Sequence, residues 1–249
     1  MSSHRAFVSA AGLRRDGRRP RETRRLMYQF GALGDCDGSA YLEQGCNKVL
    51  VAVHGPRACE KRSAAQFDRA TVTCSYQLSA FARTEHRKVH LRDRRSEQVA
   101  MAIRRTFEAV IQTHLYPRSE IAISVQVLQA DGGEVAAAIN ATTLALFEAG
   151  IPCTDFVVSC TAGHLDKVAL LDLNYEEENS GGPVVRVALL PSTAHLLTTE
   201  MTSKMSVEAF EETLTLAQAG CVQIYELLKA AMKERVMHQH AAQFRVKLR

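Results

Sequence analysis

The chain has 249 residues and a formal net charge of +4, with 46% hydrophobic and 23% charged residues. These proportions are typical of a folded, water-soluble protein and exclude an intrinsically disordered chain. Because no run of 18 apolar residues occurs and arginines interrupt the first twenty residues, we expect neither a membrane span nor a secretory signal. The seven cysteines form no CxxC pair, so we expect reduced, mostly buried thiols and no zinc site.

Basic and acidic residues are segregated along the chain, although the net charge is nearly balanced. Eight arginines lie between residues 5 and 25, and eight basic residues lie between residues 83 and 105. Acidic residues gather instead at 166–178 and 200–212. Such segregation can build a positive surface that the net charge conceals, although a solvated helix face and a frayed basic terminus are the simpler alternative. Because most of the basic residues are arginines, whose planar fork suits phosphate, the pattern favours a nucleic-acid surface.

Apolar periodicity predicts alternating strands and helices. In chain order the first half contains a strand over 47–54, an alternating strand over 71–82, a charged loop over 83–95, a helix over about 96–115, a strand over 121–127 and an alanine-rich helix that ends at Gly150. The second half contains strands over 155–161, 168–173, 184–190 and 194–200, a long helix capped by Ser206, and a loose polar tail over 238–249.

Both halves therefore contain several strands followed by a helix, and Pro152 lies near the junction. This order predicts an α+β fold of two related β-rich lobes, with helices packed on one face of each sheet. We expect a flexible lead over 1–13, a first domain over 14–150, a second domain over 151–236 and a basic C-terminal tail over 237–249.

A Gly-Gly turn, Asp131-Gly132-Gly133, opens the alanine-rich helix. The free N–H groups and the positive dipole end of such a helix start can bind an anion, although most such turns only connect two elements. Here Glu134 and Val135 follow the turn. A carboxylate at the helix start takes the place of a phosphate and repels it, so we expect a degraded phosphate site.

Acidic residues also follow the strand that ends near Leu173. Asp172 and Glu178 lie at the strand end and in the segment after it, where two carboxylates can hold one Mg²⁺ for phosphoryl transfer. A solvated acidic loop is the alternative, and the pattern alone favours it.

Five motifs together resemble a known family. They are RxDGRxxxExR from Arg14, DGS at Asp37, VHGPR from Val53, LQADGG from Leu128 and AGIP from Ala149. The chain resembles the RNase PH family over about residues 14–236, and within it the eukaryotic exosome core subunits of the ribosomal-RNA-processing protein 41 type. The resemblance implies two RNase PH domains, 14–150 and 151–236, of the ribosomal protein S5 domain 2-like topology. It also implies kinship with phosphorolytic 3′-to-5′ exoribonucleases that form six-membered rings around an RNA pore.

The resemblance also assigns roles to single residues. It places the two catalytic aspartates of the family on Asp172 and Glu178, of which the second is longer by one methylene. The Thr-Arg pair that binds phosphate in active members is replaced here by Glu134 and Val135. The residues that it implies for RNA binding are Arg94, Arg95, Arg92 and Arg62.

These substitutions predict a catalytically inert ring subunit of the exosome that needs no cofactor. Its expected role is to guide RNA during degradation and during processing, including the processing of ribosomal RNA. The alternatives are an active phosphorolytic exoribonuclease that uses Asp172, Glu178, Mg²⁺ and inorganic phosphate, and a stand-alone RNA-binding module. The implied partners are other RNase PH-like subunits in a heterohexamer, RNA-binding cap subunits, a hydrolytic exoribonuclease and single-stranded RNA. The implied locations are the nucleus, nucleolus and cytoplasm, with no membrane contact. Because no aromatic residue accompanies the arginines in the sequence, we expect little base stacking.

Overall fold

The computed structural model describes residues 7–9, 11–59, 65–83, 93–166 and 168–247, with side chains up to residue 239. Its elements are β1 (Leu26–Phe30), β2 (Gly38–Gln44), β3 (Asn47–Ala58), β4 (Thr71–Leu78), α1 (Arg94–Glu108), the 3₁₀ turn η2 (Thr113–Leu115), β5 (Ser119–Gln129), α2 (Glu134–Glu148), β6 (Val158–Leu165), β7 (Val168–Leu171), α3 (Tyr175–Glu178), β8 (Val184–Leu190), β9 (His195–Met201) and α4 (Val207–Lys247).

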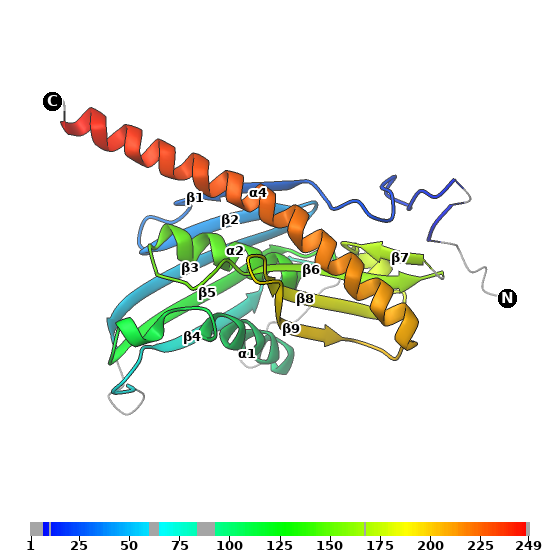
Figure 1. Ribbon diagram of the computed structural model, residues 1–249, viewed down its shortest axis with the longest axis horizontal. Coiled ribbons are helices and arrows are strands. Elements are labelled where there is room, and N and C mark those ends of the chain that lie inside the picture. Colours follow the sequence, from blue (N-terminus) through cyan, green and yellow to red (C-terminus); the bar gives the residue numbers. More distant parts are fainter. Residues whose placement is uncertain (1–6, 10, 60–64, 84–92, 167, 248–249) are drawn as a thin grey trace.

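The strands form two sheets (Figure 1). The first has the order β1-β2-β3-β5-β4, in which only the β4–β5 pair is parallel. The second has the order β7-β6-β8-β9 and is antiparallel throughout. Alternation explains the inner strand β5, where Ile121, Ile123, Val125 and Val127 are all buried on one face.

Helix α2 is buried on all sides because it lies between the two sheets. It contacts β2 and β3 of the first sheet and β6 and β8 of the second. Every residue from Glu134 to Leu146 is buried, which explains why the helix is rich in alanine. The main apolar cluster therefore contains side chains from both sheets, such as Val51 and Val187, so the two lobes share one core.

Helix α4 lies across the second sheet and extends beyond the first (Figure 1). Its buried face includes Ala217, Cys221, Ile224 and Leu228, at the predicted helical spacing. The α+β prediction of two β-rich lobes with packed helices is confirmed. Within the described residues, no helix is long and apolar enough to cross a membrane.

The first helix is shorter than predicted. The apolar spacing predicts a helix to about residue 115, but α1 ends at Glu108. After that point the backbone pairs with the segment that joins the lobes, because Thr154 N–H donates to Val110 O and Gln112 N–H donates to Pro152 O. These tertiary hydrogen bonds replace the helical ones, although the apolar spacing continues to Ile111.

Two further predictions are wrong. The loose tail expected over 238–249 is helical as far as Lys247, because no Gly or Pro follows Gly220 to stop α4. The cysteines are not mostly buried: all seven lie in the described part of the chain and none forms a disulfide, but only Cys160 and Cys221 are buried. Burial raises the pKa of the Cys221 thiol to about 12.

Candidate functional site

Asp172 is the centre of a buried ionic network. It is 0% exposed, and its φ of +53° turns the chain sharply after β7. Its carboxylate accepts hydrogen bonds from Arg24 N–H at 2.8 Å, from Arg24 Nη2 at 2.7 Å and from Gln44 Nε2 at 3.0 Å. Burial raises the pKa of Asp172, but the charge and hydrogen bonds of Arg24 outweigh it and hold the pKa below its ordinary value. The carboxylate is therefore ionised and fully engaged within the protein.

The same guanidinium shapes the Gly-Gly turn. Arg24 Nη1 donates to Asp131 O at 2.6 Å, and Arg24 Nη2 donates to Gly132 O at 3.0 Å. Asn47 secures the turn from β3, since it donates to Gly132 O and accepts from Asp131 N–H, both at 2.5 Å. Gly132 and Gly133 have φ values of +73° and +66°, which other residues adopt with difficulty.

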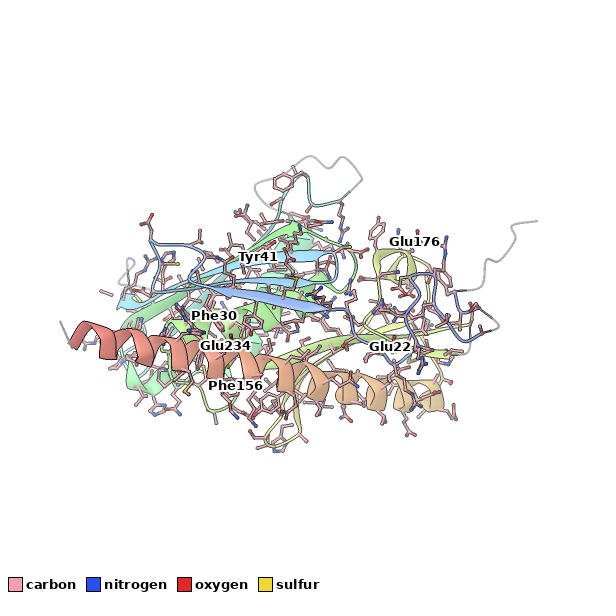
Figure 2. All side chains as sticks on the ribbon, turned by 90° about the horizontal axis from the view of Figure 1, so that it is seen from above. Glu22, Phe30, Tyr41, Phe156, Glu176 and Glu234 are labelled. Atoms are coloured by element: carbon pink, nitrogen blue, oxygen red, sulfur yellow. The ribbon has the colours of Figure 1, made fainter. Side chains whose placement is uncertain are left out.

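Helix α3 is held against this turn by a second buried ion pair. Arg14 Nε donates to Glu177 Oε1 at 2.8 Å, and Arg14 Nη2 bonds the other oxygen of the same carboxylate. Glu177 and Asn174 form a capping box at the start of α3. Tyr175 N–H donates to Asp131 Oδ1 at 3.2 Å, so the helix begins directly beside the turn. Figure 2 shows the neighbouring Glu176 at the same end of the molecule as Glu22 from the N-terminal segment.

The two predicted acidic residues have different environments. Glu178 is partly exposed, and its Oε2 accepts the N–H of Gly133 at 2.8 Å, so it lies on the turn. Asp172 lies beneath the turn and faces Arg24. The Mg²⁺ site that the alternative of an active enzyme would place between them does not fit this arrangement, because both oxygens of Asp172 already bind a cationic side chain. Among the described residues, no group of three or more His, Cys, Asp or Glu side chains is placed to hold a metal.

Glu134 begins α2 and is paired with two arginines. Its Oε1 accepts from Arg83 Nη2 at 2.6 Å and lies 3.5 Å from Arg95 Nη2. The Glu134 side chain is 6% exposed, whereas that of Arg95 is 58% exposed. The repulsion of phosphate that the sequence suggests is therefore offset by two adjacent cations.

The arginines predicted to bind RNA are divided between described and undescribed segments. Arg94 and Arg95 begin α1 and are exposed, and Arg95 reaches the turn through Glu134. Arg62 and Arg92 lie outside the described residues.

Two neighbours of the turn were not predicted as site residues. Arg83 pairs with Glu134 and lies over the ring of Tyr175, with 5.9 Å between its Cζ and the ring centroid. Tyr175 lies within the acidic motif, but no spacing in the sequence connects it with Arg83. Only the tertiary contact reveals an aromatic ring beside the arginines.

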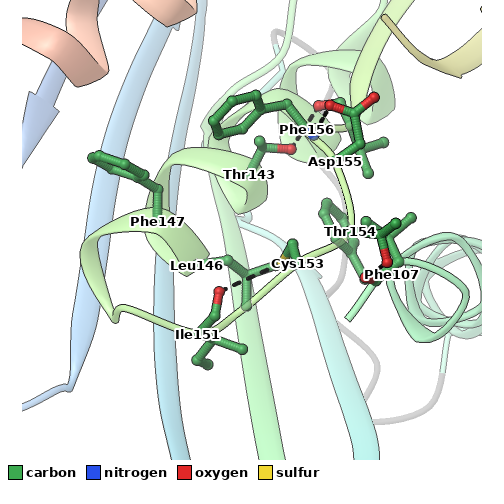
Figure 3. Close-up of a pocket in the computed structure, with 11 residues that line it drawn as sticks. Phe107, Thr143, Leu146, Phe147, Ile151, Cys153, Thr154, Asp155 and Phe156 are labelled. Carbon is green, nitrogen blue, oxygen red and sulfur yellow. Dashed lines mark hydrogen bonds between the residues drawn. The ribbon is translucent and has the colours of Figure 1, made fainter. Parts of the chain in front are cut away.

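An apolar cavity of about 260 Å³ lies elsewhere, between the ends of α1 and α2 and the segment 151–157 (Figure 3). Phe107, Phe147 and Phe156 line it. Its polar groups are already engaged, since Thr143 Oγ1 donates to Val157 O and Thr154 Oγ1 donates to Val110 O. None of the residues of the Gly-Gly turn or α3 lines this cavity.

Comparison with known proteins identifies the family. Residues 22–152 match domain 1 of the 3′ exoribonuclease family, and residues 155–220 match its domain 2. The chain belongs to this RNase PH family. Among its relatives, "Exosome complex component RRP41 homolog" of Arabidopsis thaliana is 44% identical over 92% of this chain and 95% of the relative. "Exosome complex component RRP41" of Homo sapiens is 43% identical over 94% of each chain.

Solved structures confirm the RNase PH fold. The crystal structure of rice (Oryza sativa) Rrp46 covers 88% of this chain and 100% of its own, with a TM-score of 0.79 and 24% identity. A structure described as "archaeoglobus fulgidus exosome with RNA bound to the active site" covers 88% of this chain and 93% of its own, with a TM-score of 0.76 and 18% identity. At these identities the likeness concerns the fold alone.

The prediction of a catalytically inert subunit is wrong. Both domains of the chain match the 3′ exoribonuclease family. "Exosome complex component Rrp41" of the archaea Thermococcus kodakarensis and Methanopyrus kandleri is 38% and 39% identical over 93% and 92% of this chain, so the relatives are not confined to eukaryotes. The acidic residues Asp172 and Glu178 are present, and the charge of Glu134 is balanced by arginines. The Glu134-Val135 substitution is therefore no ground for treating the family chemistry as lost.

Proposed function

We propose that this chain is an RRP41-type exosome subunit that pairs with other RNase PH-like subunits in a heterohexameric ring and guides single-stranded RNA past its Gly-Gly turn. The relatives named as exosome components support this role, because they align over nearly the whole chain. We propose RNA-binding cap subunits and a hydrolytic exoribonuclease as its further partners. We also propose that the complex is present in the nucleus, nucleolus and cytoplasm. Guidance of RNA needs no cofactor.

The observation that carries the proposal is the position of the exposed arginines. Arg94 and Arg95 begin α1, and Arg95 lies 3.5 Å from Glu134 at the start of α2. One exposed cation, Arg95, therefore lies next to the helix start that follows the turn, and a second, Arg94, adjoins it along the chain. Arginines of this kind bind phosphates without reading the base sequence, so they suit a path for RNA of any sequence.

Replacing both Arg94 and Arg95 by glutamine is expected to reduce the affinity for RNA and the salt dependence of that affinity. Each phosphate contact on single-stranded nucleic acid contributes about 0.7 to the slope of log K against log salt concentration, so the slope should fall by about 1.4. Fluorescence anisotropy of a labelled RNA measures the affinity and its salt dependence. The RNA is titrated, at several salt concentrations, with the exosome complex purified through an affinity tag on this chain (the tagged complex).

The matched control replaces Arg104 and Arg105 with glutamine. These arginines are exposed on the same helix and carry the same charge, but they lie near its other end. We expect the control to lower the slope by less than half as much as the first double variant does. An equal loss in both double variants contradicts the proposed path, because it indicates a general charge effect.

A second candidate function is phosphorolytic 3′-to-5′ exoribonuclease activity. The family supports it, and Glu178 is a partly exposed carboxylate bonded to Gly133 N–H. Arg83 and Arg95 lie next to Glu134, at the start of the helix that follows the turn, where they can attract an anion. Under this hypothesis Glu178 is the acid–base group and Asp172 holds Arg24, while inorganic phosphate and Mg²⁺ are supplied by solution.

The activity is tested with the tagged complex, single-stranded RNA, Mg²⁺ and inorganic phosphate. We expect release of nucleoside diphosphates that depends on phosphate and falls by about a hundredfold or more in Glu178→Gln, the usual cost of losing an acid–base group. Glu176→Gln is the control, because Glu176 is exposed on the same short helix and its carboxylate pairs with the exposed Arg15. Absence of nucleoside diphosphates, or equal loss in both variants, contradicts this candidate.

A further inference from the structure

We propose that Tyr175 is a stacking platform for a base near the 3′ end of bound RNA. The inference rests on the proposed function, because it assumes that RNA passes the Gly-Gly turn. It adds a contact of a different kind: the arginines bind phosphates, whereas the ring of Tyr175 binds a nucleobase. The sequence alone predicts little stacking, because no aromatic residue is directly beside Arg62, Arg92, Arg94 or Arg95 along the chain.

Hydrogen bonds and close packing hold the backbone of Tyr175 in place. Its N–H donates to Asp131 Oδ1, and the preceding residue, Asn174, caps α3 through its capping box with Glu177. Glu177 is in turn held by Arg14, whose side chain is buried. The backbone of Gly132 packs so closely that a Cβ atom there would lie 2.7 Å from the nitrogen of Tyr175. A fixed platform loses little conformational entropy when a base stacks on it.

The surroundings of the ring also suit a nucleotide. The guanidinium of Arg83 lies 5.9 Å from the ring centroid and is held there by its ion pair with Glu134. Tyr175 is partly exposed, so part of its surface faces solvent. The same Glu134 carboxylate lies 3.5 Å from Arg95, which connects the ring to the exposed arginines of α1.

The ring of Tyr175, which can stack on a base, and the arginines, which can bind phosphates, therefore lie around the same Gly-Gly turn. Stacking on an aromatic ring tolerates any sequence, because every base has a π-face. Arginine beside the ring adds a cation–π contribution and favours the anionic backbone. The ligand is therefore a nucleotide of single-stranded RNA with no fixed base identity, at the end on which 3′ exoribonucleases act.

The test compares two RNA oligonucleotides that have the same length and charge. One carries ordinary bases, and the other has abasic ribose at its three 3′-terminal positions. We expect the tagged wild-type complex to bind the first about tenfold more tightly, as a single aromatic platform implies. Tyr175→Ala should remove this preference, and Tyr175→Phe should retain it.

A merely structural role for Tyr175 predicts another pattern, because a distorted site weakens binding of both oligonucleotides equally. That outcome overturns the proposal, as does a preference that survives in Tyr175→Ala or is absent from the wild type. Tyr28→Ala is the control, since Tyr28 is also partly accessible, at 37%, but lies on β1. The Tyr28→Ala complex should prefer the oligonucleotide with ordinary bases as strongly as the wild-type complex does.

A second measurement uses the purified chain, which contains no tryptophan. Tyr175→Trp introduces a single tryptophan, whose emission should be quenched by adenosine monophosphate but not by ribose 5-phosphate. Equal responses to both ligands overturn stacking. If Arg94 and Arg95 support RNA binding but no base preference appears, only the stacking proposal fails. If neither oligonucleotide binds the complex, the proposed function itself fails.

Discussion

Replacing Arg24 with alanine is expected to lower the free energy of unfolding by about 3–5 kcal/mol, because it removes the hydrogen-bonded cation of the buried Asp172 carboxylate and leaves only Arg18 Nη1, at 3.9 Å. The Arg24 side chain makes two hydrogen bonds to that carboxylate and two more to the carbonyls of Asp131 and Gly132. The hydrogen bond from the Arg24 backbone N–H to Asp172 remains in the variant. Denaturant unfolding followed by circular dichroism measures the change. Loss of folding altogether agrees with the prediction.

Arg25→Ala is the matched control, because Arg25 is the next residue and its side chain is exposed. We expect a change within about 0.5 kcal/mol, as for most surface substitutions. A double variant, Arg24→Ala with Asp172→Ala, should be more stable than Arg24→Ala alone, since no buried charge then lacks a partner. A control as unstable as Arg24→Ala contradicts the assignment.

The effect of Arg24 also depends on pH. In the folded protein the pKa of Asp172 is lowered, so its stabilising contribution is present above the unfolded pKa of about 3.9 and is lost as pH falls through the folded value. The difference between wild type and Arg24→Ala should therefore narrow below about pH 4. A constant difference across that range contradicts the electrostatic explanation.

Replacing Gly132 with alanine is expected to destabilise the protein by about 2–5 kcal/mol, through a strained φ that contributes about 1–2 kcal/mol and an overpacked contact that contributes about 1–3 kcal/mol. Gly132 has a φ of +73°, and its Cβ would lie 2.5 Å from the carbonyl carbon of Asn174. Because backbone and not a flexible side chain is in the way, α3 must move. RNA binding should weaken together with stability.

Gly150→Ala separates the two causes. Gly150 has a nearly identical φ of +70°, but apart from its chain neighbours no heavy atom lies within 4 Å of the place that a Cβ would take. This control should therefore show only the strain of the left-handed backbone, about 1–2 kcal/mol. It should leave RNA affinity unchanged. Equal effects of the two substitutions contradict the close packing of the turn against α3.

The fold was largely predictable because local patterns coincide with global packing. The alternation of Ile121, Ile123 and Val125 indicated a strand, and the helical spacing of α4 indicated its buried face. Strands β1 and β2 were not predicted, because three of the five residues of β1 are exposed and show no alternation. Their pairing, Leu26 with Gln44 onward, depends on the neighbouring strand and not on their own sequence.

The candidate site was predictable only in part. The motifs identified the Gly-Gly turn, Glu134, Asp172 and Glu178, but they could not show which carboxylate is buried. Asp172 and Arg24 are 148 residues apart, so their pairing leaves no periodic signal. The erroneous expectation of an inert subunit came from considering Glu134 without Arg83, whose charge balances it.

By itself, the sequence determined the fold class, the segregation of charge and the family, because each of these depends on patterns that are continuous along the chain. The near-balanced charge of +4 includes an arginine-rich α1 start and an acidic segment around α3. Only the tertiary structure decided how these charges are used. It buries Asp172 against Arg24 and brings Tyr175 next to Arg83, since burial and long-range proximity arise only when distant segments pack together.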